Sequence, residues 1–191
     1  MGGPSKDHWV GAKRVLRYLK GTSKHGLIYQ KSVDFNLVGY SDSDWAGCED
    51  TRKSTSGYVF MLGDNLISWA SKKQPVVALS TTEAEYIALC LATQEAVWLR
   101  RLLESVQHAQ QGPTQIHEDN NGTISIAKNP RDTQRTKHID IRYHFVRESV
   151  QKKIVVIEKC ESLNMIADTF TKSLPRPAFE KHRTAMNISQ C

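Results

Sequence analysis

Apolar residues follow two different periods along this chain, and the change between them separates strands from helices. Between residues 35 and 71 apolar and polar residues largely alternate, which predicts three strands at 35–42, 57–62 and 66–70. Gly63-Asp64-Asn65 joins the last two and is typical of a tight hairpin, so these strands are expected to be antiparallel neighbours. Residues 80–106 then repeat their apolar positions at helical spacing and predict one long helix.

The second half of the pattern alternates strands with helices. Its predicted strands lie at 114–117 and 154–157, and its predicted helices at 122–128, at 139–150 and from Ser162 or Asn164 through Lys172. Three consecutive strands followed by alternating helices and strands predict an α/β domain. Its mixed sheet would have an antiparallel half and a parallel half.

Two further segments flank this domain. Residues 7–20 form a predicted amphipathic helix, and residues 26–30 a short predicted strand. We therefore divide the chain into an N-terminal extension at 1–33, a main domain at 34–175 and a C-terminal tail at 176–191. One side of the N-terminal helix is basic, which fits contact with a phosphate backbone and docking on the main domain equally well.

Composition narrows the class of protein only modestly. The chain has 191 residues, 39% hydrophobic and 24% charged, which is ordinary for a globular domain. No apolar run approaches the roughly 18–20 residues of a membrane span, so no membrane partner is expected. Four widely spaced cysteines disfavour a zinc site or a disulfide scaffold. A net charge of +6 and a pI near 9.2 mildly favour a polyanionic partner.

Acidic residues recur where the predicted elements end or begin. Asp42 closes the first strand and Asp119 directly follows a later one, and open α/β sheets place their sites at such strand ends. Glu85 and Asp168 lie in the N-terminal regions of predicted helices that can face the same crevice. We therefore expect these four carboxylates to meet in space.

Neighbouring acids have simpler structural explanations. Glu83 completes a capping box with Ser80, whereas capping does not explain Glu85. Asp44 lies past the predicted strand end, where it is expected to cap the turn before Trp45. Glu118 points to the other side of its strand from Asp119.

Four carboxylates at one hydrated site repel one another unless cations neutralise them. Hard oxygen ligands without a histidine or cysteine cluster favour Mg²⁺ or Mn²⁺ over zinc. Two such ions about 4 Å apart can align a water, a phosphodiester and a leaving oxygen for in-line displacement. The acids thus point to a metal-dependent hydrolase.

Five stretches carry a resemblance to a known family. They are YSDSDWAGCEDTRKSTSGYVF, ISWASKKQPVVALSTTEAEYIAL, EDNNGTISIAKNP, RTKHIDIRYHFVRE and IADTFTKSLP. Together, over about residues 35–175, they resemble the ribonuclease H domain of copia-type LTR-retrotransposon Pol polyproteins. The N-terminal HWVGAKRVLRYLKGTSKHGLIY resembles the segment that joins reverse transcriptase to ribonuclease H in that family.

The resemblance implies a five-stranded sheet of order 3-2-1-4-5, with helices on both faces, and a D-E-D-D metal site. The site's members would be Asp42, Glu85, Asp119 and Asp168, holding two Mg²⁺ ions for which Mn²⁺ can substitute. The implied activity is cleavage of the RNA strand of RNA/DNA hybrids during reverse transcription, leaving a 5′ phosphate and a 3′ hydroxyl. The reverse transcriptase domain of the same polyprotein would be a partner. The implied location is the element's virus-like particle in the cytoplasm, with the nucleus as the alternative.

Cellular ribonucleases H have a histidine that assists product release and precedes the last aspartate. No histidine lies between Lys153 and Asp168 in this chain, so His138 is a substitute only if the fold brings it near.

Basic and polar residues near the acids are candidates for nucleic-acid contacts. They are Arg52, Lys53, Ser54, Thr55, Lys72 and Lys73, together with a third cluster of Arg135, Lys137 and His138. Each cluster is explained equally well without a ligand, as solvated charges or as residues that hold a loop together. Trp45, Trp69 and Trp98 are expected in the core rather than on a stacking surface.

Two other functions fit the same pattern. A domesticated or degenerate copy would bind hybrids without cutting them, although binding alone needs no cluster of repelling acids. A related integrase or resolvase nuclease would cut DNA instead of the hybrid.

Overall fold

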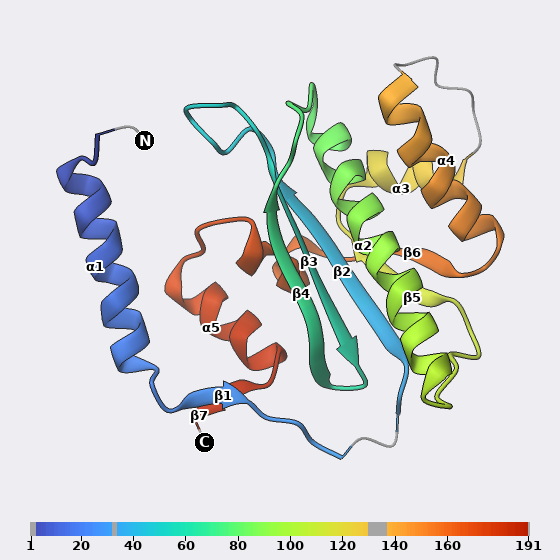
Figure 1. Cartoon of the computed structure of the whole chain (residues 1–191), viewed down its shortest axis with the longest axis horizontal. Coiled ribbons are helices and arrows are strands. Elements are labelled where there is room, and N and C mark those ends of the chain that lie inside the picture. Colours follow the sequence, from blue (N-terminus) through green and yellow to red (C-terminus); the bar gives the residue numbers. More distant parts are fainter. Residues whose placement is uncertain (1–2, 32–33, 130–136, 191) are drawn as a thin grey trace.

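The computed structural model describes residues 3–31, 34–129 and 137–190, and for residues 137–140 it describes the backbone alone. A five-stranded sheet with the order β4-β3-β2-β5-β6 organises the domain (Figure 1). Its strands are β2 (Leu37–Asp44), β3 (Thr55–Leu62), β4 (Asn65–Lys73), β5 (Thr114–Glu118) and β6 (Val155–Lys159). β2, β3 and β4 pair antiparallel, whereas β5 is parallel to both β2 and β6. The expected mixed sheet and its order are confirmed.

Three helices cover one face of this sheet: α2 (Thr81–Ser105), α3 (Asn121–Lys128) and α4 (Lys137–Gln151) (Figure 1). The core beneath them includes Phe60 and Ile116 from the sheet and Leu89 from α2. α2 packs against β2 and β3, and Glu85 in its first turns lies close to Asp42 near the C-terminal end of β2. The long predicted helix is thus confirmed.

The other face is covered by a short 3₁₀ segment, η2 (Ile166–Phe170), and by α5 (Arg176–Ala185). The prediction of one final helix through Lys172 is wrong. The region forms η1 (Ser162–Asn164) and then η2, and residues 165–168 are buried in succession. η2 packs against β2 and β3, and Met165, Ile166 and Ala167 belong to the core on this face, so tertiary packing rather than helical spacing decides the path of this segment.

Residues 176–191 were expected to form a tail, but they contain α5 and a short strand, β7 (Ile188–Gln190). Pro177 lies in the first turn of α5, where its missing N–H costs nothing, so it begins a helix rather than preventing one. β7 pairs antiparallel with β1 (His25–Leu27), which ties the two ends of the chain together. Met186 is buried in the core on this face of the sheet.

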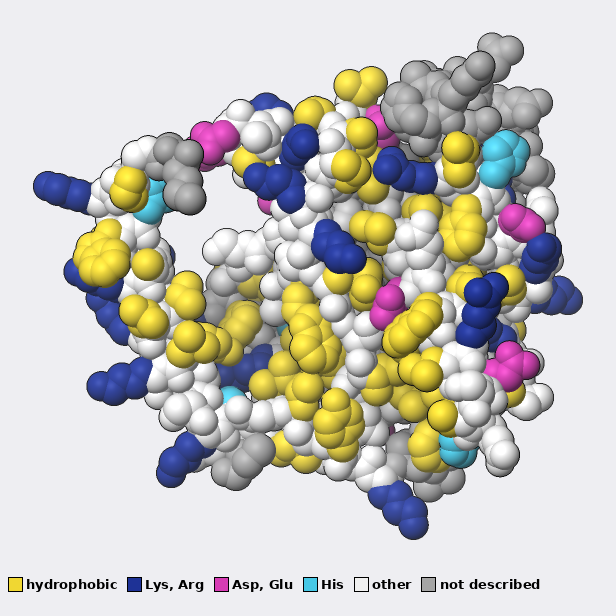
Figure 2. Space-filling model, in the orientation of Figure 1, with side chains coloured by type: hydrophobic (Ala, Val, Ile, Leu, Met, Phe, Trp, Pro, Cys, Tyr) yellow, Lys and Arg dark blue, Asp and Glu magenta, His cyan; other side chains and the backbone are white. Residues whose placement is uncertain are grey.

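The predicted N-terminal helix is present as α1 (Lys6–Gly21), and none of its residues is buried. Tyr18 contacts Phe179 of α5 edge to face at 5.7 Å between ring centroids. Open space separates the N-terminal half of α1 from the body of the molecule (Figure 2). Trp9, Leu16 and neighbouring apolar side chains of α1 are therefore exposed. Among the helices in the described ranges, none combines the length and the apolar character needed to cross a membrane.

The three tryptophans expected in the core are each about half exposed, so that prediction is wrong. Trp69 lies on the edge strand β4, and Trp98 lies on the side of α2 away from the sheet. Trp45 follows the end of β2, where its indole N–H donates to the carbonyl of Ala78 at 3.1 Å. Residues that are apolar in the sequence are therefore not all core residues.

Candidate metal centre

Three of the four predicted acids meet at the C-terminal ends of β2 and β5. Asp42 lies on β2, Asp119 directly follows β5, and Glu85 lies in the first turns of α2. One carboxylate oxygen from each of these residues lies within 4.8 Å of the other two. Parallel pairing of β2 with β5 produces this meeting, because it brings the two strand ends to the same edge of the sheet.

The fourth acid, Asp168, reaches the site through a lysine. Lys172 donates from its Nζ to Asp42 Oδ1 at 2.8 Å and to Asp168 Oδ1 at 2.9 Å. Asp168 lies on η2 and is buried, so it approaches Asp42 from the face opposite α2. All four predicted acids therefore lie at one end of the sheet, as two groups that share Asp42.

Two hydroxyl groups fix the orientation of the aspartates. Thr171 donates from its hydroxyl to Asp42 Oδ2, the oxygen that Lys172 does not contact. Ser162 donates to Asp119 Oδ2 at 2.6 Å. Sequence reasoning did not assign Lys172, Thr171 or Ser162 to the site. The one available signal was the spacing of four between Asp168 and Lys172, which is typical of an ion pair.

Glu85 is the acid whose surroundings most favour a cation. Its side chain is buried, and Glu85 Oε2 has no hydrogen-bond partner among the described residues. Burial, and then the nearby carboxylates of Glu118, Asp42 and Asp119, raise the pKa of Glu85 to about 10. A buried carboxylate without a donor is costly unless a proton or a metal ion neutralises it.

Glu83, two residues earlier, has the capping role expected of it, but its carboxylate accepts from Leu79 and not from the Ser80 N–H that a capping box uses. Its backbone N–H donates to the Ser80 hydroxyl at 3.2 Å, so Ser80 is the N-cap of α2. The Glu83 carboxylate accepts from the backbone N–H of Leu79 at 2.9 Å, one residue before the N-cap. The two glutamates therefore separate as predicted, one capping the helix and the other facing the acids.

A fifth acid, Glu118, is fully buried beside the site. It lies on the α2 face of the sheet, where it accepts a hydrogen bond from the Ser41 hydroxyl at 2.8 Å. A second bond comes from the backbone N–H of Asn120 at 3.2 Å. Burial raises the pKa of Glu118 to about 8, and these two hydrogen bonds lower it in part.

The donors present fit a hard divalent cation. Asp42, Glu85 and Asp119 offer carboxylate oxygens, the ligand type that Mg²⁺ and Mn²⁺ prefer. Burial, and then the charge of Asp42, raise the pKa of Asp168 to about 6 despite the contact with Lys172. A cation held by these oxygens would neutralise the carboxylates whose burial and mutual repulsion raise these pKa values.

The predicted nucleic-acid residues of the first two clusters lie at the same end of the sheet as the acids. The strand register aligns Asp44 with Thr55 and Thr55 with Lys73, two positions beyond the pair of Asp42 and Gly57. Arg52, Lys72 and Lys73 are exposed there. They can therefore contact a polyanion that lies across the acids.

Ser54 is the exception among these candidates. Its side chain is fully buried, and its hydroxyl accepts a hydrogen bond from the backbone N–H of Ala46 at 3.0 Å. Ser54 therefore shapes the connection between β2 and β3 and is not available to a phosphate. Arg135 and the side chains of Lys137 and His138 lie outside the described residues, so the third cluster and the role of His138 stay predictions.

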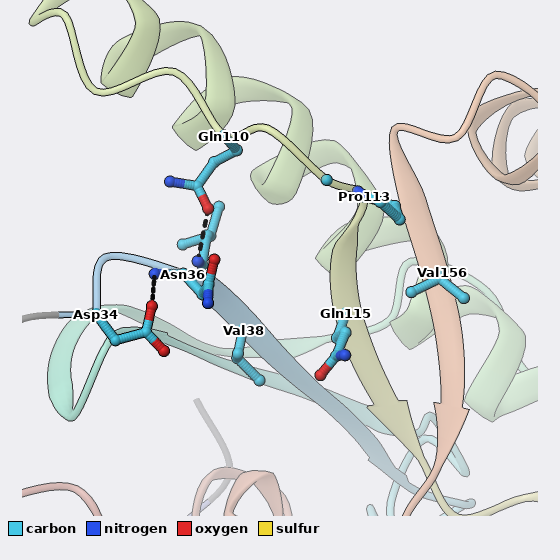
Figure 3. Close-up of a pocket in the computed structure, with 9 residues that line it drawn as sticks. Asp34, Asn36, Val38, Gln110, Pro113, Gln115 and Val156 are labelled. Carbon is cyan, nitrogen blue, oxygen red and sulfur yellow. Dashed lines mark hydrogen bonds between the residues drawn. The ribbon is translucent and has the colours of Figure 1, made fainter.

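A cavity of about 390 Å³ opens at the other end of the sheet, where β2 and β5 begin (Figure 3). Gln110 lines it, and its side chain accepts from the backbone N–H of Leu37 and donates to the carbonyl of Phe35, each at 2.8 Å. These two bonds satisfy backbone groups where β2 begins. The cavity thus lies far from the acids, and its main polar side chain has a structural role.

Comparison with known proteins identifies sequence relatives of the chain. No family model matches the chain. The retrovirus-related Pol polyprotein from transposon RE2 of Arabidopsis thaliana is 42% identical over 185 residues, which are 97% of this chain and 13% of that protein. The corresponding polyprotein from transposon TNT 1-94 of Nicotiana tabacum is 44% identical over 177 residues, 93% of this chain and 13% of that protein. The chain thus spans about an eighth of the length of these curated relatives.

Solved structures give the fold. The ribonuclease H1 of the halophilic archaeon Halobacterium salinarum superposes with a TM-score of 0.53 at 15% identity, covering 71% of this chain and 94% of that one. LC11-RNase H1, solved in complex with an RNA/DNA hybrid, gives a TM-score of 0.52 at 11% identity, with coverage of 71% and 94%. Over nearly its whole length the chain therefore corresponds to a segment of the retrovirus-related Pol polyproteins of copia-type transposons, and it has the ribonuclease H fold.

Proposed function

We propose that this chain is a metal-dependent endoribonuclease that cleaves the RNA strand of RNA/DNA hybrids during reverse transcription of a retrotransposon. The observation that carries the proposal is the meeting of Asp42, Glu85 and Asp119 within 4.8 Å around a buried glutamate oxygen that has no described donor. A binding surface for nucleic acid needs positive charge, not a buried group of acids. A cation site that activates phosphodiester hydrolysis needs the acids.

Each acid would have a defined task. Asp42, Glu85 and Asp119 would hold one divalent cation, and Asp42 with Asp168 would hold a second, Mg²⁺ being the expected ion and Mn²⁺ a substitute. Bound ions would activate the attacking water and stabilise the leaving 3′ oxygen, which leaves a 5′ phosphate and a 3′ hydroxyl. Thr171 and Ser162 orient two of the carboxylates through their hydroxyl groups.

The hybrid is the substrate that the surroundings of the site support. One structural neighbour was solved with an RNA/DNA hybrid bound. Exposed Arg52, Lys72 and Lys73 lie at the same end of the sheet as the acids and can contact phosphates. RNA would be distinguished from DNA through its 2′-hydroxyl groups, which a wide, shallow minor groove presents to side chains.

The reverse transcriptase domain of the same polyprotein is the proposed protein partner. The relatives are Pol polyproteins of which this chain spans about an eighth. The exposed apolar side chains of α1, among them Trp9 and Leu16, lie apart from the ribonuclease H fold and can be buried by another part of such a polyprotein.

The test offers a labelled hybrid, an RNA duplex and a DNA duplex side by side with Mg²⁺. We expect cleavage of the RNA strand of the hybrid, loss of cleavage on removing the metal with EDTA, and a 5′ phosphate on the product. Asp119→Asn should abolish cleavage and keep hybrid binding, whereas Asp64→Asn, at an exposed turn between β3 and β4, should change neither. Cleavage of the DNA duplex with the hybrid left intact would indicate an integrase or resolvase type of nuclease, and binding without cleavage a degenerate copy.

A further inference from the structure

Lys172 separates the four acids into two sets that share Asp42. The open group is Asp42, Glu85 and Asp119, and the closed pair is Asp42 and Asp168. Its ammonium group bridges Asp42 Oδ1 and Asp168 Oδ1 at 2.8 and 2.9 Å. In the open group, Glu85 Oε2 has no described donor, and one oxygen from each of Asp42, Glu85 and Asp119 lies within 4.8 Å of the others. Two cation positions that share Asp42 therefore differ before any ion binds.

The bridge occupies one carboxylate oxygen of Asp42 and one of Asp168, between which an ion shared by the two residues would lie. A divalent ion coordinated by that pair would lie a few ångströms from the ammonium group, where like charges repel strongly in a partly buried site. The two carboxylate oxygens that accept hydrogen bonds from Lys172 would also lose those bonds if they coordinated the ion. An ion can therefore enter between Asp42 and Asp168 only when Lys172 moves away.

Lys172 is placed so that it can move. Its side chain is 36% exposed, whereas that of Asp42 is fully buried. The backbone before it stays fixed, since Thr171 donates to Asp42 and the backbone N–H of Lys172 donates to the carbonyl of Asp168 at 2.9 Å. Rotation of a long, flexible side chain toward solvent is thus sufficient to open the position.

We propose that Lys172 is a positioning residue that takes the place of one divalent cation, so that the two positions fill in order. The Asp42–Glu85–Asp119 position fills first, and the Asp42–Asp168 position fills only as Lys172 is displaced. The inference rests on the proposed function, which assigns a divalent cation to each of the two positions. It can nevertheless be measured by metal binding in the absence of any nucleic acid.

The wild-type chain gives a first test, by acetylation of lysines with an amine-reactive reagent followed by peptide mass spectrometry across a Mn²⁺ titration. Lys172 should be protected without metal, and its acetylation should rise at least threefold over the Mn²⁺ range in which the second ion binds. Lys152, paired with Glu148 on the surface of α4, is the internal control and should not change. Acetylation of Lys172 that stays constant or falls at saturating Mn²⁺ would overturn the proposal.

Variants give a second test, by calorimetric titration with Mn²⁺. The wild type should bind one ion tightly and a second more weakly. Lys172→Met should bind the second ion at least tenfold more tightly, as should Lys172→Gln, which keeps polar contacts without the charge. Lys172→Arg and the surface control Lys152→Met should behave as the wild type. A second ion that binds no more tightly to Lys172→Met and Lys172→Gln than to the wild type would overturn the proposal.

The two proposals fail separately. A chain that shows ordered binding and displacement of Lys172 but cuts no hybrid would overturn the proposed function and leave the ordered metal site intact. A chain that cuts hybrids while Lys172 stays protected at saturating metal would leave the function intact and overturn the inference.

Discussion

Ser41 on β2 donates a 2.8 Å hydrogen bond to the buried carboxylate of Glu118 on β5. The glutamate that precedes Asp119 of the acid group is therefore held by another side chain of the protein. Asp119 is partly exposed at the open group of acids, whereas Glu118 has no exposed surface. The strand alternation turns the two side chains to opposite faces of the sheet. One of these neighbours is thus placed to bind an ion and the other to hold two strands together.

Glu118→Gln should therefore behave unlike Asp119→Asn. The glutamine keeps the shape and polar contacts of Glu118, so hybrid cleavage is expected to persist, while Asp119→Asn abolishes it. Without metal at pH 9, Glu118→Gln should stabilise the fold by about 1 kcal/mol, since it removes the cost of a buried charge. Urea denaturation in EDTA checks the stability, and loss of cleavage in Glu118→Gln would instead place Glu118 among the metal ligands.

The metal-free protein should lose stability as the pH rises from about 5 to 9. Burial raises the pKa of Glu85 to about 10, and it raises that of Glu118 to about 8 and that of Asp168 to about 6. In the unfolded chain these groups ionise near pH 4. Between the two values the folded state binds more protons than the unfolded state, so the free energy of unfolding decreases with rising pH.

Urea denaturation in EDTA at several pH values measures this slope. Saturating Mg²⁺ should flatten it, because the ion neutralises the same carboxylates that protons neutralise. Glu85→Gln should flatten it without metal. A free energy of unfolding that rises with pH in EDTA would show that the acids do not bury unneutralised charge.

Of the four acids that the sequence predicted, Asp42 and Glu85 could be found because each depends on a local pattern. Alternation placed Asp42 at the end of its strand, and the capping role of Glu83 left Glu85 free for the site. Both inferences need only neighbours along the chain and a parallel sheet that brings strand ends together. The sheet order could be stated from the resemblance and is confirmed by the strand pairing.

Residues that act through contacts between distant segments were beyond the sequence. Lys172 and Thr171 contact Asp42 from about 130 positions away in the chain, and no local period records that contact. Trp69 and Trp98 are exposed because no other described element packs over them. The hydrophobicity of a residue does not reveal whether such a neighbour exists. Ser54 was predicted as a phosphate ligand because it lies among polar and basic residues in the sequence. Its burial depends on the path of the connection between β2 and β3, which the sequence does not reveal.

Thr171 should tune the site through Asp42. Its hydroxyl donates to Asp42 Oδ2, and Thr171→Val removes that donor while keeping the volume of the side chain. Outer-sphere hydrogen bonds of this kind typically contribute about 10–100-fold to metal affinity or activity, so Thr171→Val should weaken Mn²⁺ binding and cleavage by that order.

Thr171→Ser is the matched control, because it retains the hydroxyl and should stay near the wild type. Calorimetry with Mn²⁺ and hybrid cleavage supply the measurements. Equal metal affinity in Thr171→Val and Thr171→Ser would show that the orientation of Asp42 does not depend on this bond.

Gly57 should be required for the position of the segment that carries Asp168. It pairs with Asp42 in the sheet, and a Cβ added there would lie 2.7 Å from Thr171 Cγ2 and 3.2 Å from the carbonyl oxygen of Ala167. The carbonyl of Ala167 is backbone and cannot rotate away, so Gly57→Ala requires η2 to shift relative to β3. We expect a loss of about 1–3 kcal/mol in stability from this overpacking. Displacements of about 1 Å at an active site can cost about 100-fold in rate.

Gly11→Ala is the matched control for Gly57→Ala, because a Cβ at Gly11 on α1 meets nothing within 4 Å. It should raise the helicity of α1 and leave cleavage unchanged, since Ala favours a helix over Gly by about 1 kcal/mol. Chemical denaturation and Mn²⁺-dependent cleavage of the hybrid distinguish the two variants. If Gly57→Ala retained wild-type cleavage and Mn²⁺ affinity, close packing of η2 against β3 could not be what positions Asp168.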